Sequence, residues 1–353
     1  MSAVMIILLC LFALHAQIAD ENRIWEDYCS ATRTTALKGI FVVIVFVSHF
    51  RGYMEIGDGD MLAEKIAGFL GQLMVAPFLF YSGFGVMESI QKKGISYVKQ
   101  IPVNRALKTL LHYDAAVLLY CVLNWVLGKS LKATDVLQAL LCWKSIGNST
   151  WYIFTMVCMY LVTAISFLLF GRKHYLALAS VTAFSILYAF LLEPVKEAWW
   201  YNTVLCYGLG MWYSVLRPLV EKLVSKNDLR YISAVLLGFY VFRQLGRFEA
   251  VSHWVYQAYA MAFVILMVGI SMKLRMDNPF LQFLGKHTFG IYILQRLPMI
   301  YFTEKGIFVH NTVTLFIMCF LVTCIFALLF DMLTERLDRI VFVRNSGSVS
   351  LHK

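Results

Sequence analysis

Charged residues are scarce in this chain. Asp, Glu, Lys and Arg make up only 15% of its 353 residues, whereas a soluble domain carries about one quarter. Hydrophobic residues reach 60% and the mean hydropathy is +0.70, which is more apolar material than one core can bury. These values exclude an ordinary cytosolic enzyme, a disordered chain and a nucleic-acid-binding module. The composition predicts a protein that crosses the membrane several times.

The familiar motifs of soluble enzymes are also missing. The chain contains no nucleophile elbow, no phosphate-binding P-loop and no His-Glu-x-x-His metal motif. Its eight cysteines form no Cys-x-x-Cys pair and no Cys/His spacing suited to zinc, so we expect them to be packing residues. No metal site and no tightly bound cofactor are expected.

The chain is composed mainly of long apolar segments. A spanning helix needs about 20 largely apolar residues, and short polar or Gly/Pro-bearing breaks separate the candidates. The sequence predicts an all-α integral membrane protein with about ten core transmembrane helices and one extra N-terminal hydrophobic helix. The predicted segments are residues 3–19, 37–54, 66–88, 106–127, 150–170, 174–193, 198–216, 230–247, 250–272, 287–303 and 310–333.

The domain organisation follows from these segments. Residues 1–32 form a hydrophobic segment and a polar connector, residues 33–335 the membrane domain, and residues 336–353 a basic tail. Residues 1–19 have no basic start and no good cleavage site, so an extra membrane helix is favoured over a signal peptide. Residues 133–144 are too short to span and are expected to lie in the interface or to re-enter the membrane.

The basic residues predict an orientation. If residues 37–54 run outward, one set of loops holds 21 of the 31 Lys and Arg residues and the other set holds 10. Because cytoplasmic loops carry the excess of Lys and Arg, the C-terminus is expected in the cytoplasm. This pattern is typical of a multi-pass protein of the bacterial cytoplasmic membrane, and it also explains the net charge of +10.

Two ionisable residues share one predicted helix. Lys38 precedes His49 by eleven residues, close to three turns, so both lie on about the same face, roughly 16 Å apart along the axis. Ionisable groups inside spans are costly and are candidate functional residues. Such a helix suits a reaction whose reagents approach from both sides of the membrane. An alternative remains open, in which Lys38 snorkels to lipid phosphates and His49 lies at the head groups.

Two further groups of residues surround these candidates. Arg105 and Lys108 lead into the helix at 106–127 and are suited to the phosphates of an anionic, nucleotide-like donor. More distant lysines, such as Lys99, are better explained by contact with lipid. On the outer side, Arg243 lies about one turn inside its segment and is expected to line, with His49, a cleft for a hydroxylated acceptor. Asp114 is expected to pair with His112 or a neighbouring lysine.

Four short elements, in order, resemble the membrane acyltransferase 3 family. Residues 36–50 resemble its first core helix, in which a basic residue precedes a His by eleven positions. Residues 78–84 (Phe-Leu-Phe-Tyr-Ser-Gly-Phe) are similar to its Phe-Phe-x-x-Ser-Gly-Phe element. Residues 150–153 and 284–294 resemble its Trp-Phe and late Gly-Lys-x-Ser-x-x-x-Tyr-Leu elements. The likeness covers about residues 33–333.

The resemblance implies a ten-helix O-acyltransferase that moves an acyl group, most often acetyl, from cytoplasmic acyl-CoA to a hydroxyl of a cell-surface or lipid-linked carbohydrate. His49 is then the expected general base or acyl carrier, and Lys38 meets the donor. The remaining expected donor-binding residues are Arg105, Lys108, Arg33 and Ser82, and the expected acceptor-binding residues are Arg51, Trp151, Tyr152 and Arg243.

The chain departs from the family pattern at two positions. Lys38 stands where the family commonly has Arg, which keeps the charge but loses the two-pronged hydrogen bond. Gln295 stands where the late element often ends in His. A transporter or flippase is the main alternative, although its usual internal repeats are not evident. A membrane sensor is a third possibility, but no soluble output domain follows the membrane part.

Overall fold

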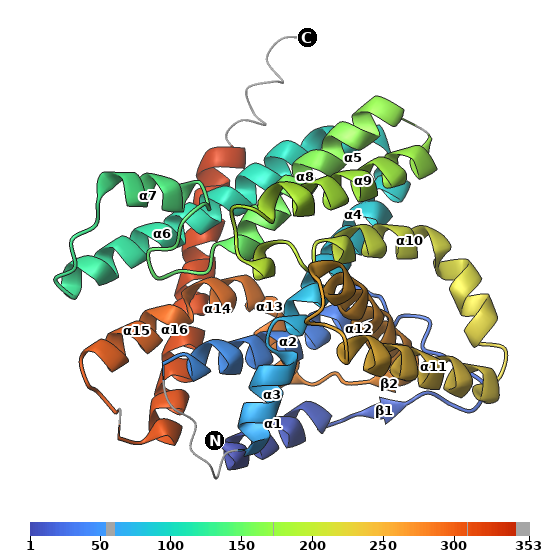
Figure 1. Ribbon diagram of the computed structural model, residues 1–353, viewed down its shortest axis with the longest axis horizontal. Helices are drawn as coiled ribbons and strands as arrows, with labels where there is room; N and C mark the ends of the chain where they lie inside the picture. Colours follow the sequence, from blue (N-terminus) through green and yellow to red (C-terminus); the bar gives the residue numbers. More distant parts are fainter. Residues whose placement is uncertain (54–60, 172, 309, 344–353) are drawn as a thin grey trace.

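The computed structural model describes residues 1–53, 61–171, 173–308 and 310–343, and these are almost entirely helical (Figure 1). The principal helices in chain order are α1 (Ser2–Ala13), α2 (Ala31–Arg51), α3 (Met61–Leu70), α4 (Ala76–Lys93), α5 (Ile95–Ile101), α6 (Lys108–Val126), α7 (Ala133–Leu140), α8 (Trp151–Phe170), α9 (His174–Leu192), α10 (Leu205–Val224), α11 (Asp228–Gly246), α12 (His253–Lys273), α13 (Pro279–Lys286), α14 (Thr288–Leu294), α15 (Arg296–Glu304) and α16 (Thr312–Asp338). Single 3-10 turns occupy Leu73–Val75 and Ala198–Trp200, and wider π-helical turns occupy Pro102–Leu107 and Arg339–Val343. Strands β1 (Gln17–Ile18) and β2 (Leu274–Arg275) form one short antiparallel pair.

Seven helical segments of the described chain are long and apolar enough to cross a membrane. They are Ala31–Arg51, Leu73–Lys93, Ile95–Val126, Trp151–Phe170, His174–Leu192, His253–Lys273 and Thr312–Phe342. The predicted all-α membrane fold is therefore confirmed. The short segment predicted at 133–144 forms α7, which ends at Leu140 and is too short to span.

The N-terminal hydrophobic helix is shorter than predicted. α1 ends at Ala13 instead of reaching residue 19, because the chain turns into β1, which pairs with β2 at the end of α12. The side-chain amide of Asn278 donates hydrogen bonds to the carbonyls of Leu11 and Leu14 and fixes this exit. Twelve residues give a rod of about 18 Å, which is shorter than the hydrocarbon layer of about 30 Å.

Two segments predicted as continuous helices are each divided into two α-helices, and a third, at 198–216, begins with the separate 3-10 turn Ala198–Trp200 before α10 starts at Leu205. The segment at 66–88 is divided at Gly71 into α3 and α4, with one 3-10 turn between them. The segment at 287–303 is divided at Gln295 into α14 and α15, and α13 precedes it. Hydropathy missed both breaks because Gly71 and Gln295 are small or polar residues within largely apolar segments.

Glycines bring two helix pairs into close contact. A Cβ added at Gly83 on α4 would lie 2.0 Å from the carbonyl oxygen of Tyr207, and one at Gly210 on α10 would lie 2.0 Å from that of Phe80. A Cβ at Gly285 on α13 would lie 1.8 Å from the carbonyl oxygen of Thr35 on α2. Small residues at such crossings let backbones approach, which is how membrane helices associate without a hydrophobic driving force.

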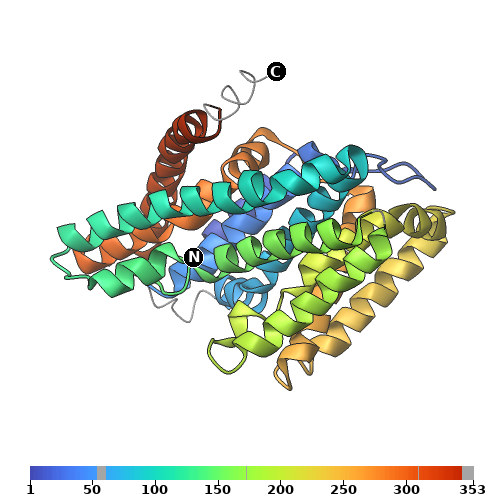
Figure 2. The ribbon, with the colours of Figure 1, turned by 90° about the horizontal axis from the view of Figure 1, so that it is seen from above.

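Helix α2 lies in the interior of the bundle. In Figures 1 and 2, α11 and α12 lie on one side of the molecule and α6, α7 and α15 on the other. In α2, 72% of the most apolar window is buried within the protein, against 33% for α9. A helix that is apolar all round and surrounded by protein is shielded from lipid, so its few polar side chains face other helices.

Candidate active site

Lys38 and His49 lie on one continuous helix, as predicted. The Ser30 hydroxyl accepts a hydrogen bond from the backbone N–H of Arg33 and caps the start of α2, which then runs unbroken to Arg51. Both side chains are half-buried. Lys38 stands near the beginning of the helix and His49 in its last turn, so each belongs to a different end of the bundle.

A polar cavity surrounds Lys38, and we name it the Lys38 cavity. It has a volume of about 550 Å³ and is bordered by α2, α4, α10 and the polar connector that precedes α2. Three residues predicted from the sequence meet here: Lys38, Ser82 and Arg105. Its walls carry charges of both signs, namely Lys38, Lys92, Arg105 and Arg217 together with Glu26, Asp27 and Glu88.

Arg105 reaches the cavity from a widened turn. The π-helical turn Pro102–Leu107 interrupts the long segment from α5 to α6, and such turns occur often at functional sites. The Nε atom of Arg105 donates a hydrogen bond to the Tyr97 hydroxyl, 3.1 Å away, which holds the guanidinium in place. Ser82, in the predicted Ser-Gly element, lies beside the side chains of Tyr152 and Tyr160.

Two predicted donor-binding residues do not line this cavity. Arg33 is buried and binds Asp27, with Nε 2.9 Å from Oδ2, and Asp277, with Nη1 3.5 Å from Oδ2. The Nζ atom of Lys108 lies 2.6 Å from Oδ2 of Asp338 on α16. Both residues hold protein segments together in this arrangement.

The expected partner of Asp114 is also engaged elsewhere. The Nε2 atom of His112 lies 2.9 Å from Oδ1 of Asp338, beside Lys108. Oδ1 of Asp114 is buried and has no hydrogen-bond partner within the described residues. The sequence correctly placed His112 and Asp114 on one helix. In the structure, however, His112 pairs with Asp338, which lies about 220 residues away along the chain.

Arg217 was missed as a cavity residue. The sequence placed it in a basic loop after residue 216, but α10 continues through Pro218 to Val224 and directs Arg217 into the Lys38 cavity. Its Nε atom is buried without a hydrogen bond in the described part of the chain, and its nearest acid is Glu221, 3.6 Å away. No local pattern distinguishes this arginine from other basic residues at the membrane surface.

Cys29 also lines the Lys38 cavity, yet it is not suited to act as a nucleophile. Burial raises the pKa of its thiol to about 12, although the nearby Arg217 charge opposes the shift. The thiolate, which is the reactive form, is therefore almost absent near neutral pH. Within the described residues, no group of three or more His, Cys, Asp or Glu side chains could hold a metal ion.

Aromatic side chains connect His49 with Ser82. The His49 ring lies 6.4 Å from that of Tyr292, and the Tyr292 ring lies 5.4 Å from that of Tyr152. Tyr152 in turn lies beside Ser82 at the Lys38 cavity. The hydroxyl of Tyr292 is buried and forms no hydrogen bond with any described residue. The predicted Trp-Tyr and late Tyr-Leu elements therefore meet between the two ends of α2.

A second polar cavity lies at the His49 end of α2, and we name it the Arg296 cavity. It has a volume of about 350 Å³ and is bordered by α6, α15, the chain after α2 and the loop before α8. Nε of Arg296 donates to the hydroxyl of Tyr53, 2.7 Å away, and Tyr53 follows His49 by four residues. The lining residues are Tyr53, Asn124, Lys129, Ile146, Gly147, Arg296, Ile300, Thr303 and Glu304.

The predicted acceptor-binding residues are divided by the structure. Tyr152 lies between the cavities, and Trp151 packs against it with ring centres 6.1 Å apart. Arg51 is ion-paired with Glu64 at the surface. Arg243 is exposed on α11 and lines neither cavity. The sequence predicted no role for Arg296, because nothing in the local pattern shows that this arginine lines a cavity.

The fold and these cavities define an all-α, multi-pass membrane protein with a polar site at each end of one buried helix. Residues 34–332 match the family model for the acyltransferase domain of acyltransferase 3, and the chain belongs to this family. It is therefore a membrane acyltransferase, as the sequence resemblance implied. Neither the curated proteins nor the solved structures contain a match to this chain.

Proposed function

We propose that this acyltransferase moves an acyl group, most simply acetyl, from acyl-CoA in the Lys38 cavity to a hydroxyl of a carbohydrate in the Arg296 cavity. The observation that carries this proposal is the pair of polar cavities at opposite ends of α2. Lys38 lines one cavity, and His49 lies in the last turn of α2, four residues before Tyr53, which lines the other. In this proposal, the donor's reactive end approaches His49 past the aromatic residues Tyr152 and Tyr292, which lie between Ser82 and His49.

The donor end is suited to a polyanionic thioester. Arg105 and Arg217 supply guanidinium groups that pair with phosphate oxygens, and Lys38 adds a cation deeper along the helix. A volume of about 550 Å³ lies within the range of about 300–1,000 Å³ that is usual for small-molecule sites. The extended pantetheine arm then spans the roughly 16 Å that separate Lys38 from His49 along the helix axis.

His49 acts as the general base in this proposal. The acceptor hydroxyl gives its proton to the imidazole, its oxygen attacks the thioester carbonyl, and the carbon–sulfur bond breaks to release CoA as its thiol after protonation. Imidazole is the side chain whose unperturbed titration lies nearest neutrality, so it suits this exchange. A variant of the route passes through a covalent acyl-imidazole, in which the acyl group rests on His49 before the acceptor arrives.

We assign the Lys38 end to the cytoplasm from the excess of Lys and Arg in the loops on that side. The C-terminus then also lies in the cytoplasm, and we expect the bacterial cytoplasmic membrane as the location. CoA is a cytoplasmic cofactor and surface carbohydrates lie outside, so this orientation presents each reagent to its own cavity.

Vesicles of known sidedness test the proposal. Purified protein is reconstituted, labelled acetyl-CoA is enclosed on one side, and an oligosaccharide acceptor is added to the other. We expect acylated acceptor only when acetyl-CoA faces the Lys38 end and the acceptor faces the His49 end. Product that forms only with both reagents on one side contradicts the two-cavity route, and movement of acceptor without acylation supports transport instead.

A further inference from the structure

Among the described residues, the Arg296 cavity holds one positive charge that no acidic side chain neutralises. Three charged side chains line the cavity: Lys129, Arg296 and Glu304. The Nζ atom of Lys129 lies 2.6 Å from Oε1 of Glu304, so these two form an ion pair. Arg296 forms no ion pair within the described residues, and it therefore leaves the cavity with an excess of one positive charge.

Arg296 is held in position while its outer nitrogens stay available. Nε is used by the Tyr53 hydroxyl at 2.7 Å, and the guanidinium carbon lies 5.7 Å from the centre of the Tyr53 ring. No hydrogen bond from Nη1 or Nη2 to a described residue is present. A planar guanidinium with two free nitrogens matches the two oxygens of a carboxylate or phosphate.

Other polar atoms near Arg296 also lack partners in the described chain. The Thr303 hydroxyl, in the cavity wall, and Oε1 of Gln295, directly before Arg296, are both buried without a hydrogen bond. The residue Gln295 is 0% exposed. Buried polar atoms without partners are costly, and Thr303 lines the same cavity as Arg296, so its hydroxyl is a second group available to a polar ligand there, whereas Gln295 does not line the cavity.

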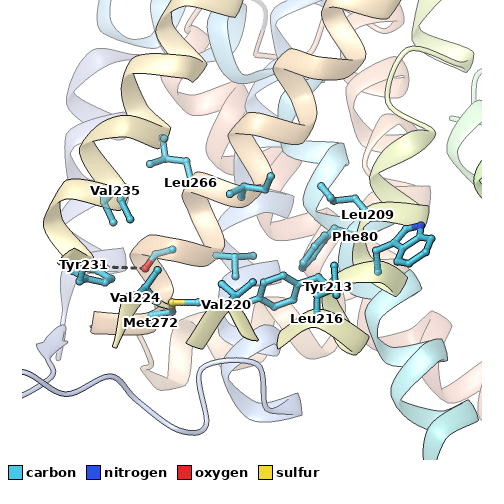
Figure 3. Close-up of a pocket in the computed structure, with 16 residues that line it drawn as sticks. Phe80, Leu209, Tyr213, Leu216, Val220, Val224, Tyr231, Val235, Leu266 and Met272 are labelled. Atoms are coloured by element: carbon cyan, nitrogen blue, oxygen red, sulfur yellow. Dashed lines mark hydrogen bonds between the residues drawn. The ribbon is translucent and has the colours of Figure 1, made fainter. Parts of the chain in front are cut away.

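An apolar cavity elsewhere in the molecule shows the contrast (Figure 3). It has a volume of about 280 Å³ between α4, α10, α11 and α12, and no charged residue lines it. Its tyrosine hydroxyls are already used: Tyr231 donates to the carbonyl of Gly269 at 2.9 Å, and Tyr213 lies 2.6 Å from the hydroxyl of Tyr28. That cavity offers nothing to a charged or hydroxylated ligand.

We propose that the acceptor of this acyltransferase is an anionic carbohydrate, whose carboxylate or phosphate binds Arg296 and thereby presents a neighbouring hydroxyl to His49. This inference rests on the proposed function and narrows its acceptor to an acidic class. Tyr53 links the two roles, because it holds Arg296 and lies four residues beyond His49. Arg296 acts as the residue that determines acceptor specificity.

Matched pairs of small acceptors test the inference. Methyl glucuronide has a carboxylate where methyl glucoside has a hydroxymethyl group, and glycerol 1-phosphate carries a phosphate that glycerol lacks. Binding of each probe to the purified full-length protein is measured without acyl-CoA, and acyl transfer is measured separately. We expect the anionic member of at least one pair to bind about tenfold more tightly, as one charge-assisted contact allows. The pair that shows the preference identifies the anion.

Variants assign the preference to Arg296. Arg296→Gln should remove the preference for the anionic probe. The Kd and KM for that probe should rise about tenfold, while the values for the neutral probe change little. Arg296→Lys, which keeps the charge, should retain part of the preference that Arg296→Gln loses. Arg247→Gln is the control, since Arg247 is exposed, directly follows α11 and lines neither cavity.

His49→Ala separates this inference from the proposed function. That variant should keep the binding preference but lose acyl transfer. Equal binding of charged and neutral probes, or a preference that survives in Arg296→Gln, overturns the inference. If neutral and anionic acceptors are acylated equally well, the proposed route of acyl transfer stands, and the inference that the acceptor is anionic is rejected.

Discussion

The Lys38 cavity and the Arg296 cavity lie at opposite ends of the same helix, yet they are built differently. The Lys38 cavity is larger, with about 550 Å³ against about 350 Å³, and four basic and three acidic side chains line it. In the Arg296 cavity, an ion pair leaves a single arginine in excess. Many charges suit a large polyanionic donor, whereas one fixed cation suits a single group on an acceptor.

The comparison also explains why α2 is buried. In the proposed reaction, the reagents come from two compartments, and a rigid element must reach from one to the other without contact with lipid. Close glycine contacts with α13 fix the Lys38 end, and aromatic contacts such as that of Phe50 with Phe316, 5.2 Å apart, fix the His49 end. The two ends are therefore held by different means and can be perturbed separately.

Replacement of His49 by Ala is expected to have the largest effect on catalysis. If His49 is the base, kcat should fall by about 10²–10⁴-fold, because that is the usual contribution of a positioned proton acceptor. Binding of acyl-CoA in the distant Lys38 cavity should stay unchanged. The measurements are acyl transfer in vesicles and equilibrium binding of CoA, with His174→Ala as the control. Wild-type transfer by His49→Ala would refute its role.

Replacement of Gly285 by Ala should damage the Lys38 end of α2. The added Cβ would lie 1.8 Å from the Thr35 carbonyl oxygen, so the helices must separate. Overpacking of this kind costs about 1–3 kcal/mol of unfolding free energy. Thermal unfolding in detergent measures the loss. Gly238→Ala is the control, because its nearest neighbour would be 3.9 Å away. Equal unfolding temperatures for the two variants would contradict the tight contact.

Replacement of Arg105 or Arg217 by Gln should weaken donor binding selectively. Each loses a charge-assisted contact in the Lys38 cavity, so the KM for acyl-CoA should rise about tenfold while kcat changes less. Lys99 is exposed on α5 outside the cavity, and Lys99→Gln should leave the KM unchanged. A rise in the acceptor KM in place of the donor KM would exchange the roles that we assign to the two cavities.

The sequence predicted the membrane fold, the family and the helix that carries Lys38 and His49, because these depend on local hydropathy and short motifs. It also predicted that Ser82 and Arg105 lie near one another and near Lys38. It could not predict that Arg33 binds Asp27 and Asp277, since competition between distant partners decides which basic residues stay available. The sequence shows which basic residues are candidates for ligand binding, and only the packing shows which of them are already paired with acidic residues.

The breaks between helices were the other information that the sequence did not provide. Hydropathy indicates how far an apolar segment extends but not where it bends, so the division at Gln295 was missed. Arg296 is the first residue after that division, and its side chain binds Tyr53 and lines the cavity. The same limit applies to α10, which continues through Pro218 and carries Arg217 to the Lys38 cavity.

Replacement of Gly85 by Ala should have the smallest effect, and its direction is informative. Gly85 lies within α4 and lines the Lys38 cavity, and no atom lies within 4 Å of the position that a Cβ would occupy. An alanine inside a helix is favoured over glycine by about 0.5–1 kcal/mol, so the free energy of unfolding should rise slightly. The methyl group nevertheless takes space in the cavity.

If that space belongs to the donor, the KM for acyl-CoA should rise modestly in Gly85→Ala and more strongly in Gly85→Leu, while neither variant unfolds more easily than the wild type. Thermal unfolding and steady-state kinetics on the same preparations separate the two effects. A Gly85→Leu protein that is stable and keeps the wild-type KM would mean that acyl-CoA binds elsewhere, and the contrast between a donor cavity and an acceptor cavity would have to be abandoned.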